Sequence, residues 1–572
     1  MNNRRWAIPI MTLFFINTMT YAEVITDGTL GQALNLPGPD YQIKPELGQQ
    51  HGGNLFHSFN QFNLTQHESA TFSGPNTVQN IISRVTGPNG SMIEGTLRST
   101  IPKADFYFLN PNGMMFGPNA KLDVQGAFYA STADYLKLSD NGRFDATHPE
   151  NSLLSVAPIT AFGFLDQAAP IILQDSQMTV SEHNRLSLIG GNIDIINSKL
   201  YAASGGIYLN SVAGSAEVST DFEKGTVDHL SEDSQITLSQ NTTLSTDSHS
   251  TADAGDIDMR AGKITIRDNA YISSNTQDIG NAGTIEIQTH HFMISDFANL
   301  SSNTLEGGKG GTIHISAAKS FDMSGETLIN TSSAETHSPA GTVSVITDEF
   351  TMRDNAIIYT ASESGTGNAG QVLIQADHFS LRDTSKIMSS TFSEGDGGNI
   401  DITAETAVLT GESAIASTTF GEGKGGDITL QADLMFSLFD HAVIDSSTQS
   451  KGAGGNITLK IDQLVVAETA SLSAESGADN PFIRDIRKLA ELAEWLGAQS
   501  YGDFSKGGRS GKVCISQPGE QCDNNSIVAI LAKNIQEISQ SDCLDGKALT
   551  ESWFKQIGRT GLFHSPDDMQ TH

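Results

Sequence analysis

Apolar and polar residues alternate along the middle of the chain in copies that recur at a nearly constant interval. Each copy opens with a glycine, and the opening glycines are Gly255, Gly283, Gly311, Gly341, Gly370, Gly398, Gly426 and Gly455. The steps between them are 28, 28, 30, 29, 28, 28 and 29 residues. Ile, Val, Leu or Met stands two and four positions after every glycine, as in Ile257 and Met259. This alternation predicts a short strand with one buried face.

Two further apolar segments complete each copy. The first holds a pair of apolar residues, as in Phe292/Ile294, Phe350/Met352 and Phe379/Leu381. The second is centred on a single apolar residue, namely Ile272, Leu300, Leu328, Ile358, Ile387, Ile415 or Leu472. We therefore expect three short strands in each copy, separated by turns. Glycine adopts positive φ without steric cost, so the glycines are expected to form the corners.

A single copy cannot bury its own apolar face, but stacked copies align equivalent residues into ladders. The pattern predicts an all-β fold, a parallel β-helix with one repeat of about 28 residues in each coil. Polar residues that follow the glycines, such as Asp256 and Asn399, are expected to stack on the outside. A β-propeller is disfavoured because a blade needs about 40 residues and four strands.

The N-terminus has the pattern of a secretory signal. Arg4 and Arg5 precede an apolar stretch, residues 6–16, that is too short to span a bilayer. Small residues then lead to a predicted cleavage between Ala22 and Glu23. Residues 1–22 are accordingly treated as a signal peptide and left out of the fold prediction.

The repeats stop near residue 477, and the sequence pattern changes after that point. Apolar residues at helical spacing predict a helix over 481–496, which we expect to cap the last coil. All three cysteines, Cys514, Cys522 and Cys543, lie in this small helical tail. Cys514 and Cys522 form a possible disulfide in an oxidising compartment, but the sequence allows the other pairings equally.

Composition narrows the function further. The chain of 572 residues has 33 Lys and Arg against 66 Asp and Glu, a formal charge of −33. Nucleic acid and anionic lipid both attract basic proteins, so neither is an expected partner. Calcium-binding nonapeptides, zinc motifs, phosphate-binding loops and nucleophile elbows are missing from the sequence. We predict no metal, no cofactor and no enzymatic activity.

Residues 23–175 differ from the repeats because they are richer in Phe, Asn and Pro. Phe106 to Leu109 reads as a buried strand, and Asn110-Pro111-Asn112-Gly113 after it is a strong turn signal. The module contains the ordered segments NLFHSFNQFNL (54–64), IISRVTG (81–87), IEGTLR (93–98), FLNPNGMMFGPNA (108–120) and LDVQGAFYAST (122–132).

These five segments in this order resemble the secretion domain of two-partner secretion exoproteins, the family of filamentous haemagglutinin, haemolysins and high-molecular-weight adhesins. The resemblance is close over residues 23–175 and extends to the repeats only in style. It implies that residues 23–175 are a secretion domain that folds as a right-handed β-helix. With the repeats, we expect this domain to be followed by a β-helical rod at 176–477 and a tail at 478–572. Many members carry an NPNL element before NPNG, whereas this chain has SGPNTVQN at 73–80.

The resemblance also implies export through a dedicated outer-membrane barrel partner of a Gram-negative-type bacterium, to the medium or the cell surface. By matching positions, Asn110, Pro111, Asn112 and Gly113 belong to the secretion motif, although a purely structural corner turn explains them equally well. Some large adhesins of the family use a C-terminal cysteine pair as a surface tether, which Cys514 and Cys522 match no better than simple stapling.

The predicted function is a secreted, adhesin-like or haemagglutinin-like rod that binds a host or cell-surface glycan or protein receptor. Two alternatives stay open. One is a haem or ligand-capture exoprotein, and the other, which the scattered Lys and Arg disfavour, is a β-helical enzyme acting on polysaccharides.

Overall fold

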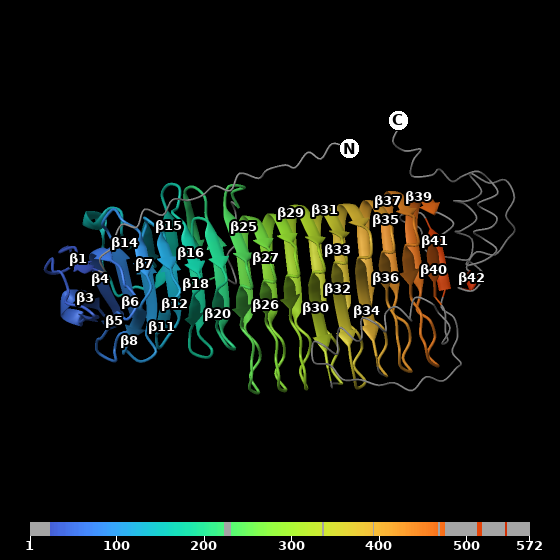
Figure 1. Cartoon of the computed structure of the whole chain (residues 1–572), viewed down its shortest axis with the longest axis horizontal. Helices are drawn as coiled ribbons and strands as arrows, with labels where there is room; N and C mark the ends of the chain where they lie inside the picture. Colours follow the sequence, from blue (N-terminus) through green and yellow to red (C-terminus); the bar gives the residue numbers. More distant parts are fainter. Residues whose placement is uncertain are drawn as a thin grey trace, which may run out of the picture.

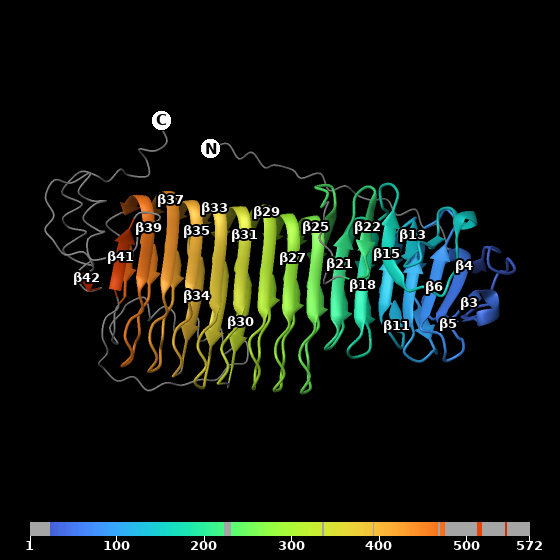
Figure 2. The ribbon, with the colours of Figure 1, turned by 180° about the vertical axis from the view of Figure 1, so that it is seen from behind.

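The computed structural model describes residues 23–221, 230–334, 337–392, 394–466, 470–474, 512–516 and 544–545. These residues form a β-solenoid of about 15 turns whose coils stack along the long axis of the molecule (Figures 1 and 2). The only helices among them are two single 3-10 turns, Pro45–Leu47 and Pro149–Asn151. The predicted parallel β-helix is confirmed.

Two lines of parallel strands run along the N-terminal half. The first line consists of β4 (Asn54–Phe62), β6 (Asn80–Val85), β9 (Asp105–Leu109), β12 (Phe128–Ser131), β18 (Arg185–Gly190) and β21 (Gly206–Ser211). The second line consists of β7 (Ser91–Ile93), β10 (Met114–Phe116), β16 (Ile171–Gln174), β19 (Ile193–Ile196) and β23 (Gln235–Ser239).

The two lines merge at β25 (Asp256–Ile266), whose first half pairs with β21 and whose second half pairs with β23. The following coils keep this long strand, as β27 (Thr284–Ile294), β29 (Thr312–Ser324), β31 (Thr342–Arg353), β33 (Gln371–Leu381), β35 (Ile400–Leu409), β37 (Ile428–Leu438) and β39 (Ile457–Val466). The expectation of three separate strands per repeat is therefore wrong for the body.

A third line of strands closes each coil. In the first coils it is β2 (Asp40–Ile43), β5 (Ser69–Phe72), β8 (Thr96–Ser99) and β11 (Lys121–Asp123). It continues as β17 (Gln177–Thr179), β20 (Lys199–Tyr201), β24 (Thr243–Ser245), β26 (Tyr271–Ser273), β28 (Asn299–Ser301), β30 (Leu328–Ser333), β32 (Ile357–Ser362), β34 (Lys386–Thr391), β36 (Ala414–Ala416), β38 (Val443–Asp445) and β40 (Ser471–Ser473).

One residue predicted for this third line is wrong. Leu300 pairs with Ile329 and not with Leu328, and Ile329 is the fully buried one. The coil between Gly311 and Gly341 is the longest of the repeats, so counting from its glycine shifts the position by one residue.

The opening glycines do not supply positive φ, which corrects the sequence prediction. Their role is close approach, because a Cβ on Gly398 would lie 1.7 Å from the carbonyl oxygen of Gly370 in the coil before. The left-handed corners are instead formed by residues such as Asp268, Asp354 and Asp383, with φ of 57°, 58° and 59°. Asp and Asn tolerate this conformation better than other residues with a side chain.

The predicted outer ladder of polar residues is confirmed. Asp256 is exposed and accepts a hydrogen bond from the backbone N–H of Thr284 in the next coil, at 2.8 Å. Asp427 accepts one from the N–H of Asn456 at 2.9 Å. Between the third and first strands, each body coil projects a loop from the same side of the rod (Figure 1). We call the stack of these loops, from 246–255 to 446–455, the fin.

Additional strands cover the N-terminal coils. β1 (Val24–Thr26) and β3 (Gln49–His51) pair antiparallel with the outer edge of β4. An antiparallel sheet of β13 (Tyr135–Leu138), β14 (Arg143–Asp145), β15 (Ile159–Phe164) and β22 (Ala216–Ser219) lies on the outside of the coils (Figure 2). A second core, including Phe56, Tyr107, Phe144 and Phe162, fills the space between this outer sheet and the coils.

At the other end, β41 (Lys512–Ser516) continues the first line beyond β39 and pairs antiparallel with β42 (Leu544–Asp545). Cys514 lies in β41 opposite Thr458. Ala22, Cys522, Cys543 and the helix expected over 481–496 lie outside the described residues. No helix in the described part of the chain has the length and hydropathy needed to cross a bilayer.

Candidate functional site

The Asn110–Gly113 turn connects β9 to β10 inside the stack of coils. Asn110 is fully buried, and its side-chain amide donates to the carbonyl oxygen of Asn89 at 3.1 Å and to Ser91 Oγ at 2.9 Å. Its Oδ1 accepts the backbone N–H of Asn112 at 3.0 Å, which closes the turn. Every polar group of the Asn110 side chain is thus used within the folded domain.

The rest of the turn is more accessible. Pro111 is partly buried, and Asn112 is exposed although its amide donates to the carbonyl oxygen of Gly87 at 2.9 Å. Gly113 has a φ of 103°, a conformation that favours glycine. The turn therefore stacks on the equivalent turn at 87–90 of the preceding coil. Asn112 is the one residue of the turn whose side chain is exposed.

A buried arginine connects four segments of the N-terminal coils. Arg84 of β6 is fully buried, with Nε donating to Ser58 Oγ at 2.7 Å and Nη1 to the Asp145 carbonyl oxygen at 2.5 Å. Nη2 donates to Thr29 Oγ1 at 3.0 Å, and the guanidinium lies 4.3 Å from the centre of the Phe144 ring. These contacts join the N-terminal segment, the coils and the outer sheet.

The electrostatics of this cluster follow from burial. Burial lowers the pKa of Arg84 to about 10, although the nearby Asp27 and Asp145 oppose the shift. Burial alone would raise the pKa of Asp27, but hydrogen bonds from Ser58, Thr29 and Thr86 lower it overall. Both groups therefore stay charged at neutral pH and hold the cluster together.

His57 of β4 is a further buried titratable group of the N-terminal coils. It is 1% exposed, and neither ring nitrogen has a hydrogen-bond partner among the described residues. Its ring packs against Phe59 and Phe72, with centroids 6.3 and 5.5 Å away. Burial lowers its pKa to about 3, so the ring is neutral.

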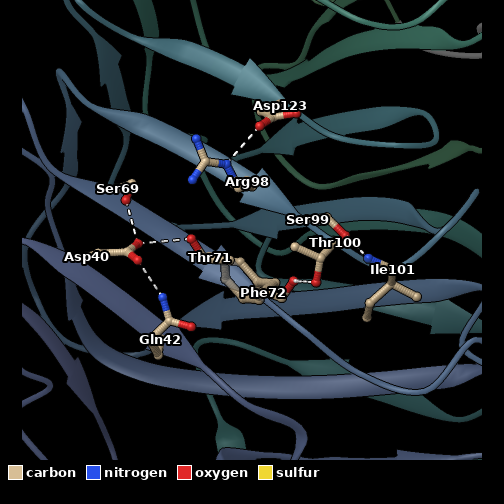
Figure 3. Close-up of polar contacts among 10 residues, drawn as sticks. All are labelled: Asp40, Gln42, Ser69, Thr71, Phe72, Arg98, Ser99, Thr100, Ile101 and Asp123. Carbon is tan, nitrogen blue, oxygen red and sulfur yellow. Dashed lines mark hydrogen bonds and ion pairs between the residues drawn. The ribbon is translucent and has the colours of Figure 1, made fainter.

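The outer face of the first four third-line strands is polar (Figure 3). Asp40 of β2 accepts hydrogen bonds from Ser69 Oγ at 2.5 Å and Thr71 Oγ1 at 3.0 Å, and the Ser69 bond is the main cause that lowers its pKa. Arg98 of β8 pairs with Asp123 of β11 at 2.7 Å (Figure 3). Two of the sequence segments quoted above, at 93–98 and 122–132, thus meet on one exposed surface.

The sequence singled out the turn but gave no role to Arg84 or His57, which the fold buries on β6 and β4, in the coils before it. Arg84 stands in the segment at 81–87 without an assigned role, and alternation alone does not show that the outer sheet covers its side. Asn110 and Arg84 lie on neighbouring strands, since Arg84 pairs with Leu109 in the ladder. The described residues contain no cluster of three or more His, Cys, Asp or Glu suited to a metal ion.

Comparisons with known proteins give three findings. Residues 22–287 match the family model described as TPS secretion domain. The heme/hemopexin-binding protein of Haemophilus influenzae is 24% identical over 192 residues, which cover 32% of this chain and 20% of that protein. The match thus spans about a fifth of the length of that curated relative. The crystal structure of the HMW1 secretion domain from Haemophilus influenzae gives a TM-score of 0.36 at 17% identity, covering 80% of this chain and 97% of that one.

Proposed function

Because the chain carries a TPS secretion domain and is a two-partner secretion exoprotein, we propose that an outer-membrane transporter reads its N-terminal coils before they fold. The observation that carries this proposal is the state of Asn110, which is buried and fully hydrogen-bonded in the folded domain. A transporter has no access to that amide once the coils have formed. Recognition of the side chain therefore has to precede folding.

The division of labour along the chain is part of the proposal. Residues 1–22 direct the chain to the periplasm, 23–175 are the address read by the transporter, 176–477 form the working rod, and 478–572 form the tail. Mass spectrometry of the exported protein tests the first point, because cleavage leaves Glu23 at the new N-terminus. Retention of a C514S variant on cells, compared with wild type, tests whether the tail tethers the protein.

Outside the cell we propose that the rod is an adhesin-like binding protein with no enzymatic activity. Its outward ladders repeat polar side chains from coil to coil, as in Asp256, Asp427 and Asn456, which suits many weak contacts with a glycan or protein receptor. The name of the Haemophilus relative favours ligand capture as a second candidate. Titration of the exported protein with haem separates the two, since capture gives a stoichiometric absorbance change.

The export experiment compares the chain with and without its cognate barrel partner and assays the medium and cell surface. We expect export only with the partner. N110A and S91A each remove the hydrogen bond between Asn110 Nδ2 and Ser91 Oγ, but only N110A changes the motif, and it also removes the bonds to the Asn89 carbonyl oxygen and the Asn112 N–H. If the transporter reads Asn110, N110A lowers export at least tenfold and S91A does not.

Two results contradict the proposal. Equal loss of export in N110A and S91A shows that the turn acts only through the stability of the folded corner. Partner-independent appearance in the medium, or periplasmic retention with the partner present, contradicts the export route itself. Hydrogen exchange of the amides of β9 and β10 in both purified variants is the control. We expect the larger loss of protection in N110A, which also loses the bonds to the Asn89 carbonyl oxygen and the Asn112 N–H, so each loss of export is compared with the measured loss of protection.

A further inference from the structure

A cleft of about 310 Å³ opens on the rod where the fin joins the long strands of β31, β33 and β35. The returning limb of the fin forms one wall, at Pro339, Asn368 and their neighbours. The strand starts at Thr342, Gln371 and Asn399 form the other wall, and opening glycines form the floor between them.

A side-chain ladder is interrupted at the cleft. In the fin wall, Lys309 N–H donates to Asn281 Oδ1 at 3.1 Å, and further along Asp396 N–H donates to Asn368 Oδ1 at 3.0 Å. The residue at this position in the intervening coil is Pro339, which has neither an N–H nor a polar side chain. The ladder therefore breaks at Pro339, which lines the cleft.

The chemistry of the lining is uniform. Its side chains are the amides of Asn368, Gln371 and Asn399, the hydroxyl of Thr342, and small apolar groups such as Pro339. None of the described residues that line the cleft carries a charge, although Gln371 Nε2 donates to the neighbouring Asp401 carboxylate at 3.3 Å. The same two ladders hold charged groups elsewhere, such as Asp256 and Lys424, so the cleft lies on an uncharged stretch of the two ladders.

We propose that this cleft binds one or two rings of an uncharged oligosaccharide, an inference that rests on the rod's proposed role as a receptor-binding protein. Amides and hydroxyls donate to and accept from sugar hydroxyls, and the small apolar groups suit the C–H face of a ring. The volume lies near the lower end for ligand pockets. The net charge of −33 repels sialylated and sulfated glycans.

The glycines on the floor of the cleft are unsuitable for testing the site. A Cβ on Gly370 would lie 1.9 Å from the carbonyl oxygen of Gly341, so substitution there disturbs the coil stack as well as the cleft. The test therefore uses wall residues. Thr342 and Thr284 occupy the same position in different coils, both are partly exposed, and only Thr342 lines the cleft.

The experiment uses the full chain collected from the medium and titrates it with maltotriose, cellotriose and chitotriose, with 3′-sialyllactose as a charged probe. Saturation-transfer NMR and calorimetry report binding. We expect millimolar to micromolar binding of at least one neutral probe and at least tenfold weaker binding of the charged one. T342Y, which fills the cleft, lowers the affinity at least tenfold, and T284Y leaves it unchanged. Q371A lowers it about fivefold, the loss of one hydrogen bond.

Equal binding by T342Y and T284Y overturns the site, and a preference for 3′-sialyllactose overturns the ligand class. No binding of any neutral probe overturns the inference as well. None of these results touches the export proposal, which is measured by partner-dependent appearance in the medium. A protein that is exported and adheres to cells without binding neutral sugars leaves the proposed function in place and removes only this cleft from it.

Discussion

The first coils and the repeat body share one solenoid but are stabilised in different ways. In the first coils the interior holds many aromatic rings at irregular angles, as with Phe72, Phe106 and Phe128. An outer sheet buries the second face of the same strands and encloses Arg84. In the body, equivalent residues stack on themselves, as where the Phe321 and Phe350 rings lie 4.8 Å apart at 2°.

The two kinds of packing predict how far the loss of stability caused by one substitution spreads along the rod. A ladder residue contacts its own equivalents in the adjacent coils, so the body behaves as a sum of similar coils and interfaces. The first coils depend on contacts that occur once, between segments far apart in sequence, such as Arg84 with Thr29 and Ser152. We expect local, repeatable effects of substitution in the body and domain-wide effects in the first coils.

The largest expected effect tests the glycine ladder of the body. In G398V the new Cβ lies 1.7 Å from the Gly370 carbonyl oxygen and 2.2 Å from Ser389 Oγ, so the two coils have to separate. We expect a loss of more than about 5 kcal/mol, an exceptional value for one substitution. Hydrogen exchange of the amides of β33 and β35 measures it, and protection in β4 and β6 should not change.

The control is G214A, where no atom lies within 4 Å of the added Cβ and only the φ of 88° opposes it. We expect a cost of about 1 kcal/mol there. If G398V also exposes the amides of β4 and β6, the body and the first coils unfold as one unit and the comparison fails.

The second prediction concerns the single buried cation of the first coils. R84M leaves Thr29 and Ser58 without their donor and removes the charge beside Asp27, and it should cost about 3–5 kcal/mol. R98M removes a pair with Asp123 in which the side chains are 41% and 49% exposed, and it should cost under about 1 kcal/mol. Hydrogen exchange of the amides of β4 and β6 compares the two variants. Equal losses of protection contradict the role given to Arg84.

The third prediction compares how the stability of the two regions depends on pH. Burial lowers the pKa of His57 to about 3, so the unfolded chain takes up the proton first and the free energy of unfolding falls as pH drops below 6.5. The loss is about 2 kcal/mol between pH 6.5 and 5. Burial raises the pKa of Glu363 in the fin to about 7, and its stabilising effect, full below 4.5, is lost as pH rises through 7.

The two regions should therefore respond to pH with opposite signs. Hydrogen exchange at pH 5 and pH 8, corrected for the intrinsic rate, should show weaker protection of β4 at the lower pH and of β32 at the higher pH. H57F and E363Q each abolish one response and leave the other. Responses of the same sign in both regions, or persistence in these variants, would contradict the assignment.

Much of the body was predictable because its ladders repeat the same physical requirement in every coil. The interval between glycines and the alternation after each glycine located the long strands. For the third line of strands, the predicted buried residue was off by one position only at Leu328. A spacing of eight residues from Phe292 to Leu300, and from Phe350 to Ile358, points to Ile329 after Phe321. The presence of glycine alone did not reveal its role, because close approach of neighbouring backbones and a positive φ both require glycine.

The candidate site was predictable in position but not in environment. Pro and Asn marked the turn at 110–113, yet burial of Asn110 depends on the adjacent coil at 87–91, which local signals do not place. Arg84 lies in a strand in which the alternation of apolar and polar residues is lost, because the adjacent Ile81 and Ile82 are buried on opposite faces of β6. That loss of alternation was the one signal of an additional layer, and it does not identify which segment covers the strand.

The smallest expected effect returns to the aromatic rings. Phe350 stacks between Phe321 and Phe379, but Ala407 occupies the same ladder position one coil beyond Phe379, so the ladder already accommodates a small side chain. F350L should cost about 1 kcal/mol, confined to its neighbouring coils. F106L removes contacts with rings on three strands and should cost about twice as much. Local hydrogen exchange measures both, because a repeat array does not unfold in two states. An equal, equally local loss in the two variants would mean that the irregular aromatic core behaves as a ladder too, and that the outer sheet and Arg84 alone distinguish the first coils.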